Sequence, residues 1–284
     1  MTIRKAPITA MASHPATTGS CAPDADMDMT RSANKKIPDI LVKPWKLPPQ
    51  KTYIFQNANV VDSASGSQLA RTSLPVLGDV VVDVSGKYVC PGLIDCHVHL
   101  TSVAGDVSLI GGISTSDPAI SYFRQPFLCN QILSRGFTSV RDTGGATLAL
   151  KEAIEDDVFP GPRLFISNKA LSQTGGHGDM RGVHDKQKCC GGDSALTTVV
   201  DGVPGCIQAT REQLRTGADF IKIMAGAEIQ AIAEVADTYG TYVTAHAYTP
   251  KAIRHAVDNG VKGIEHGNFI DGGRPVIWPG RASG

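Results

Sequence analysis

The chain has 284 residues, with 27 Lys and Arg against 27 Asp and Glu, so its formal net charge is zero when histidine is neutral. Hydrophobic residues make up 42% of it, which is typical of a soluble globular protein and enough to bury a core. The balanced charge argues against a protein that binds nucleic acid by neutralising phosphates. No apolar run reaches the roughly 20 residues that a membrane-spanning helix needs.

The first part of the chain has two predicted regions. Residues 1–48 are rich in Ala, Pro, Ser, Thr and Asp and lack hydrophobic periodicity, so we expect a disordered N-terminal arm. In residues 49–87 the segments 53–62 and 79–84 have the alternation of β-strands and are followed by turn residues. We expect these strands to form a partial β-sandwich domain.

From residue 88 to residue 284 the pattern changes to strands that alternate with helices. Six short apolar strands are predicted, at 93–100, 138–143, 163–168, 219–224, 242–246 and 263–266. Helices are predicted between them, at 118–135, 147–157, 206–216, 228–239 and 250–259. This alternation predicts an α/β domain with a parallel sheet covered by helices, and it leaves a doubly wound sheet and a (β/α)8 barrel both open.

Histidines favour the barrel. Four of the eight lie at or near the carboxyl ends of predicted strands: His97, His99, His246 and His266. In a barrel these strand ends meet at one mouth, where catalytic groups collect. Residues two apart on a strand point to the same face, so His97 and His99 could offer two nitrogens to one metal ion.

Lys222 is the other unusual residue, because it lies within the apolar strand Phe220-Ile-Lys-Ile-Met224. An unpaired ammonium is costly to bury, so this group must be paired, neutralised or chemically altered. The alternative is a lysine that extends to solvent from the strand end. The four histidines at the ends of the other predicted strands favour a functional role for Lys222.

Val89-Cys-Pro-Gly-Leu-Ile-Asp-Cys-His-Val-His99 resembles the Pro-Gly-Leu-Ile-Asp-x-His-x-His signature of the amidohydrolase superfamily. The resemblance covers about residues 50–270, and the matching segments further along the chain are 137–144, 174–179, 220–224, 244–248 and 263–268. The branch it resembles includes imidazolonepropionase-like enzymes, Xaa-Pro dipeptidases and ochratoxin-hydrolysing amidases. The fold that this resemblance implies is the (β/α)8 TIM barrel.

The resemblance also implies a two-metal site. It assigns one divalent ion to His97 and His99, the second to His246 and His266, and the bridge between them to Lys222, carboxylated by carbon dioxide. We expect the ions to be zinc. It further implies that His177 and Tyr248 hold the carboxylate of an amide or dipeptide-like substrate, whose carbon–nitrogen bond is hydrolysed by a metal-bridged hydroxide.

The sequence departs from the family at one catalytic position. The superfamily's proton-transferring Asp ends the eighth strand, whereas only six strands are predicted here, so we identify no catalytic residue and expect an incomplete barrel. The main alternative is a truncated, inactive fragment or a mispredicted gene product. Two further alternatives are less favoured: a small zinc site formed by His184, Cys189, Cys190 and Cys206 within or next to an active-site loop at 180–205, and a nucleophilic Cys96.

The remaining expectations concern location and partners. The seven cysteines are too few and too scattered for a disulfide framework, and Cys90, Cys96 and Cys129 lie in apolar sequence. No apolar segment follows Arg4 and Lys5 at the N-terminus as it would in a signal peptide. We therefore expect a cytoplasmic enzyme with a small-molecule substrate, no nucleic-acid or membrane partner, and a possible homo-oligomeric state.

Overall fold

The structure is a computed structural model that describes residue 45 and residues 53–72, 80–102, 118–184, 196–224, 226 and 228–270. All elements described below belong to the unit Lys43–Gly284. The expected disordered arm at 1–48 lies outside the described residues except for Trp45, and so does the segment 271–284.

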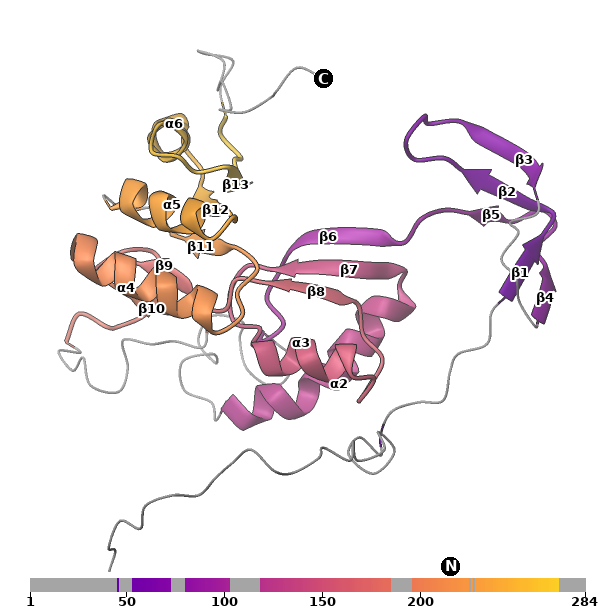
Figure 1. The fold of residues 1–284 in the computed structure, drawn as a ribbon, viewed down its shortest axis with the longest axis horizontal. Helices are drawn as coiled ribbons and strands as arrows, with labels where there is room; N and C mark the ends of the chain where they lie inside the picture. Colours follow the sequence, from indigo (N-terminus) through magenta and orange to yellow (C-terminus); the bar gives the residue numbers. More distant parts are fainter. Residues whose placement is uncertain are drawn as a thin grey trace, which may run out of the picture. The chain divides into compact units, whose positions relative to one another are not determined.

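Five short strands precede the main body: β1 (Tyr53–Gln56), β2 (Ala58–Val61), β3 (Gln68–Thr72), β4 (Val80–Asp83) and β5 (Tyr88–Val89). β1 pairs with β4 in parallel, while β2 pairs antiparallel with β3 and parallel with β5 (Figure 1). The single strand predicted at 53–62 is therefore two strands. They are separated by Asn57, whose φ of 58° is left-handed and ends the extended run.

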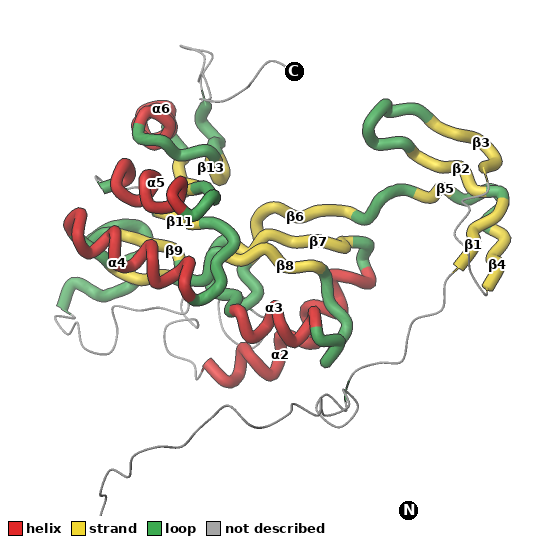
Figure 2. The backbone as a smooth tube through the Cα atoms, viewed as in Figure 1, coloured by secondary structure: helices red, strands yellow, loops and turns green. Residues whose placement is uncertain are grey.

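The first parallel sheet has the order β6-β7-β8, formed by β6 (Leu93–Val98), β7 (Phe137–Asp142) and β8 (Arg163–Ile166). Helices α2 (Pro118–Ser134) and α3 (Leu148–Glu155) pack against β7 and β8 (Figure 2). α3 begins where it does because Thr147 Oγ1 accepts a hydrogen bond from Leu150 N. Apolar side chains between these elements, including Val140, Leu164 and Ile166, form one core cluster.

The second parallel sheet has the order β10-β9-β11-β12-β13. Its strands are β9 (Ala170–Ser172), β10 (Thr197–Val199), β11 (Ile221–Ile223), β12 (Val243–Ala247) and β13 (Gly263–His266). The helices that follow its strands are α4 (Gly202–Arg215), α5 (Ile229–Thr238) and α6 (Pro250–Asp258). A second core cluster, which includes Ile221, Ile232 and Val243, lies between this sheet and its helices.

A bend at residues 167–169 links the two sheets. Asn168 has φ 55°, so β8 pairs with β7 before the bend and β9 pairs with β10 and β11 after it. The side chain of Asn168 donates hydrogen bonds to the carbonyls of Gln213 and Thr216 at the end of α4. One continuous stretch of chain thus serves both sheets.

All six strands predicted from residue 88 onward are present, and both main sheets are entirely parallel, as expected. The prediction of a loop over 180–205 was wrong in part, because β10 forms there and α4 already begins at Gly202. β10 is only three residues long and adds to the outside of β9, so no periodicity marked it. Of the cysteines expected in apolar settings, only Cys129 is buried, whereas Cys90 and Cys96 are exposed.

Two further expectations concern membrane-spanning helices and the alternative zinc site. Within the described parts of the chain, no helix combines the length and the apolar character needed to cross a bilayer. Cys189 and Cys190 lie outside the described residues, so the alternative zinc site at those positions is not visible here.

Candidate functional site

The histidines predicted to bind metal gather at the carboxyl ends of parallel strands. His97 lies in β6 and is followed closely by His99, while His246 lies in β12 and His266 ends β13. Ring centroids are 5.2 Å apart for His97 and His99, 4.7 Å for His97 and His266, and 4.6 Å for His246 and His266. These four side chains, from three strands of two sheets, form what we call the histidine cluster.

The two predicted substrate-binding residues lie beside this cluster. The His177 ring stacks on that of His246 with centroids 4.3 Å apart. The Tyr248 ring lies 4.7 Å from the His246 ring and 5.1 Å from the His266 ring. Both side chains are exposed, so they border the cluster on a side that solvent reaches.

His266 joins the cluster through an unusual backbone conformation. Consecutive residues of a regular strand point to opposite faces, yet both Glu265 and His266 contact His97. His266 has φ 70°, in the left-handed region that histidine adopts more readily than branched or bulky residues do. The turn of the backbone at the last residue of β13 therefore brings a second side chain to the same side as Glu265.

Lys222, in the middle of β11, is only 1% exposed. No hydrogen bond or ion pair of its Nζ occurs in the described part of the chain. Burial lowers the pKa of Lys222 to about 8, although the nearby negative charge of Glu265 opposes the shift. The prediction that this lysine is buried is confirmed, and a substantial fraction of its amine is neutral near pH 8.

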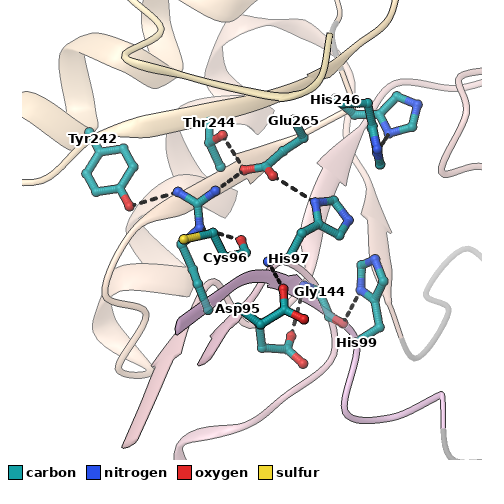
Figure 3. A network of polar contacts seen from close by, with 12 residues as sticks. Asp95, Cys96, His97, His99, Gly144, Tyr242, Thr244, His246 and Glu265 are labelled. Atoms are coloured by element: carbon teal, nitrogen blue, oxygen red, sulfur yellow. Dashed lines mark hydrogen bonds and ion pairs between the residues drawn. The ribbon is translucent and has the colours of Figure 1, made fainter. Parts of the chain in front are cut away.

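Glu265 lies at the centre of a polar network next to the cluster (Figure 3). Its Oε2 contacts His97 Nδ1 at 2.7 Å, and its Oε1 accepts from Thr244 Oγ1 at 2.6 Å and from Arg141 Nη2 at 2.5 Å. Burial opposes ionisation of this carboxyl group, but the hydrogen bonds from His97 and Thr244 outweigh it and lower its pKa to about 2. Glu265 is therefore a carboxylate at neutral pH.

Two histidines of the cluster have one ring nitrogen engaged and the other free. His97 Nδ1 bonds to Glu265, and His99 Nδ1 lies 2.9 Å from Gly144 O. Carboxylate and carbonyl oxygens only accept, so each Nδ1 carries a hydrogen, and in the neutral imidazole each Nε2 then keeps its lone pair. A lone pair on Nε2 is what a metal ion requires.

His246 and His266 are also suited to be neutral ligands. Burial, reinforced by His177 and Lys222, lowers the pKa of His246 to about 3, and burial also lowers the pKa of His266. Their rings, however, are hydrogen-bonded to each other, with His266 Nε2 3.0 Å from His246 Nδ1. At least one of these rings must turn before both can face a common ion.

The donor types fit a divalent metal ion, although the described residues hold no ready-made group of three His, Cys, Asp or Glu side chains with metal-binding geometry. The cluster offers four imidazoles, and those of His97 and His99 have Nδ1 engaged and Nε2 available. Next to them lies the buried Lys222, whose Nζ has no hydrogen bond or ion pair among the described residues. Imidazole suits zinc and several neighbouring metals, so the chemistry of the site does not single out one ion.

The loop that carries His177 is held by polar contacts on both sides. Asp179 Oδ2 accepts from Gly175 N at 2.8 Å and from Arg181 Nη2 at 2.6 Å. Thr197 Oγ1, in β10, donates to Gly178 O at 2.6 Å. The short strand β10, which no sequence pattern predicted, thus helps to place the His177 loop.

We compared the sequence with models of known protein families. The model of the amidohydrolase family matches residues 88–281, more than half of the chain. The chain belongs to the amidohydrolase family. The resemblance seen in the sequence is thereby confirmed.

Individual amidohydrolases are similar over part of their length. Ochratoxinase from Aspergillus niger is 32% identical over 213 residues, which cover 64% of this chain and 43% of that protein. A solved prolidase complexed with N-methylphosphonate-L-proline has a TM-score of 0.71 at 40% identity, covering 77% of this chain and 62% of that chain. A Xaa-Pro dipeptidase with methionine bound in its active site has a TM-score of 0.65 at 25% identity, covering 78% and 63%. This chain therefore spans less than two thirds of each of these relatives.

Arg141, Thr244 and Glu265 border the histidines of this amidohydrolase, although no sequence pattern predicted a role for them. A signal was present, since Arg141 and Glu265 are opposite charges within two predicted apolar strands. Pairing them required knowing that β7 and β13, which belong to different sheets, face each other here.

Proposed function

We propose that this amidohydrolase hydrolyses a carbon–nitrogen bond of an amide or dipeptide-like substrate with the help of divalent metal ions. The observation that carries the proposal is the histidine cluster beside the buried Lys222, which has no hydrogen-bond partner among the described residues, in a chain of this family. The ligands would be His97, His99, Lys222, His246 and His266. We propose that these residues bind two zinc ions.

We also propose that the two parallel sheets are adjoining arcs of a (β/α)8 barrel. Their order, all-parallel pairing and link through the bend at Asn168 support this reading. The proposed division of the chain is an arm at 1–48, a small β-domain at 49–87 and the barrel domain at 88–284.

The chain's own residues would prepare the site in two ways. Glu265 and Gly144 O hold hydrogens on His97 Nδ1 and His99 Nδ1, which leaves both Nε2 atoms free to bind. The desolvated Lys222 amine can add to carbon dioxide, forming an N–C bond and releasing one proton, to give a carbamate that bears the negative charge a metal ligand needs. Ions held there would supply a nucleophilic water at neutral pH and polarise the substrate carbonyl.

His177 and Tyr248 are proposed to hold a free carboxylate of the substrate. Both are exposed at the border of the histidine cluster and carry polar groups that can donate to an anion. The related prolidase and Xaa-Pro dipeptidase are named for peptides that end in proline, so a dipeptide with a C-terminal proline is the first substrate to test.

Metal analysis of the purified chain tests the proposal. We expect at least one zinc-like ion per chain, and loss of most of it in His97→Ala and His246→Ala. The control is His255→Ala, which removes an exposed histidine of α6 outside the cluster. Less than one ion per chain, or metal content that His97→Ala and His246→Ala leave unchanged, would contradict the proposed function.

A further inference from the structure

Glu265 and His97 form an unusually well-defined contact. The Glu265 side chain is 4% exposed, and its Oε2 lies 2.7 Å from His97 Nδ1. An ionised carboxylate has no hydrogen to donate, so Nδ1 of His97 must be the donor. This contact fixes which of the two ring nitrogens carries the hydrogen.

The other oxygen of Glu265 is held as firmly. Oε1 accepts from Thr244 Oγ1, one strand away on β12, and from Arg141 Nη2 on β7. Arg141 is in turn fixed, because its Nε donates to Cys96 O at 2.8 Å and its Nη1 to Tyr242 Oη at 3.2 Å. The carboxylate therefore cannot rotate away from His97 without breaking charged hydrogen bonds in a buried place.

We propose that Glu265, held by Arg141 and Thr244, is a positioning residue that locks His97 in its Nδ1–H form and thereby aims His97 Nε2 at a divalent metal ion. The proposal rests on the proposed function for the identity of the ligand, but the tautomer of His97 is a property of the metal-free chain. Outer carboxylates of this kind commonly raise the metal affinity of the histidine they contact by 10–100-fold.

A purely structural role is the competing explanation, since the same ion pair joins β7 to β13. Loss of Glu265 alone would leave the half-buried charge of Arg141 without its counter-ion, and the chain could fail to fold for that reason. The double variant Arg141→Met/Glu265→Met removes both charges and replaces them with apolar side chains, a change that buried ion pairs often tolerate. It also removes the acceptor of His97 Nδ1.

The test uses the full chain labelled with 15N-histidine and stripped of metal, at about pH 8.5, two units above the ordinary histidine pKa. The NMR chemical shifts of the ring nitrogens identify the tautomer. The signals of His97 are those that disappear in the variant His97→Ala. We expect hydrogen on Nδ1 of His97 in the wild type. In Glu265→Gln the single amide oxygen is drawn to Arg141 Nη2 and Thr244 Oγ1, so the amide NH2 faces His97 Nδ1 and we expect the Nε2–H form there. In the double variant we expect the population to move to the Nε2–H form that free neutral histidine prefers.

Zinc titration of the same samples gives the second readout. The double variant and Glu265→Gln should each bind zinc roughly 10–100-fold more weakly than the wild type, because both lose the acceptor of His97 Nδ1. Glu212→Ala, which removes an exposed partner of Arg215 on α4, should leave the affinity unchanged. His97 that keeps its hydrogen on Nδ1 in the folded double variant would overturn the proposal, whatever the zinc affinity. A wild type that binds no zinc would instead refute the proposed function and leave the tautomer result standing.

Discussion

Two buried charged residues next to the histidine cluster differ in their contacts. Among the described residues Lys222 Nζ has no hydrogen bond or ion pair, whereas Glu265 has three partners. Lys222 and Glu265 are both almost fully buried, and opposite charges would ordinarily pair in such a place. Here Glu265 is already engaged by His97, Thr244 and Arg141. The amine of Lys222 is left available, which is the state in which it can react with carbon dioxide or bind an ion.

Lys222 should therefore destabilise the metal-free chain at neutral pH. Below about pH 8 the lysine is protonated in both the folded and the unfolded chain, and the folded chain bears the cost of burying the charge. Between about 8 and the ordinary value of 10.5 the folded chain has released the proton while the unfolded chain still holds it, so stability rises with pH. The shift corresponds to roughly 3 kcal/mol.

Lys222→Met removes this cost. Chemical denaturation of metal-free protein in carbon-dioxide-free buffer should show the variant to be more stable than wild type at pH 7, with the difference shrinking toward pH 10.5. Lys262→Met, which replaces an exposed lysine paired with Asp237, should show no such pH-dependent difference. A Lys222→Met effect that is constant with pH would rule out the buried charge as its cause.

At the scale of elements, the bend between β8 and β9 and the loop of His177 are organised by side chains rather than by regular pairing. Asn168 caps the end of α4 while it turns the chain between sheets. Asp179 holds the His177 loop together, because its carboxylate accepts hydrogen bonds from the backbone amide of Gly175 and from Nε and Nη2 of Arg181. Such contacts let a loop rich in glycine hold one geometry despite its conformational freedom.

Asp179→Ala should loosen this loop. The Asp179 side chain is 6% exposed and that of Arg181 11%, so we expect a loss of about 1–3 kcal/mol in unfolding free energy. Hydrogen bonds from Arg181 and Gly175 lower the pKa of Asp179 below its ordinary value of 3.8. The stability that ionised Asp179 contributes is therefore complete above pH 3.8. It is lost as the pH falls through the lower pKa that Asp179 has in the folded chain.

Denaturant unfolding of wild type and Asp179→Ala at pH 7 and at low pH measures both effects. Asp237→Ala, which breaks the exposed pair with Lys262, should cost less than about 1 kcal/mol. Equal losses of unfolding free energy in the two variants would show that Asp179 stabilises the His177 loop no more than an exposed ion pair would.

At the scale of the whole described unit, two core clusters are joined by polar links. Asp219, just before β11, accepts hydrogen bonds from Lys151 on α3 and from the backbone of Ile166 on β8. The Arg141–Glu265 pair joins β7 to β13. These contacts couple the sheet β6-β7-β8 to the sheet that contains β11–β13.

One helix face remains apolar and exposed. Ile120, Phe123 and Phe127 of α2 are 45%, 85% and 69% exposed, and their spacing of three and four residues puts them on one side of the helix. An exposed apolar stripe of this kind favours association between protein molecules. We therefore expect the 284-residue chain to self-associate in solution through this face.

Phe123→Glu/Phe127→Glu should reduce that association without unfolding the chain, since both rings are largely exposed. Light scattering coupled to size-exclusion chromatography, with circular dichroism to check the fold, measures the outcome. Val203→Glu, at a single half-exposed apolar position of α4, is the control and should change little. If the double variant associates as strongly as the wild type, the α2 face is not responsible.

The sequence by itself determined the parallel α/β character, the six main strands and the family. The reason is local: short apolar strands alternate with amphipathic helices, and the histidines and Lys222 lie within or next to those strands. It also predicted the burial of Lys222, because a short run of apolar residues is typical of a parallel strand covered on both faces. It did not reveal β9 or β10, each of which has three residues and no periodic pattern.

Only the tertiary structure decided which side chains meet. The Glu265–His97 contact spans 168 positions of the chain, and the Arg141–Glu265 contact spans 124. The bend at Asn168 is likewise held by carbonyls of another element, the end of α4. A hydrogen bond requires two partners at one distance and angle, and strands that no local pattern relates to each other are brought together only by the packed sheets.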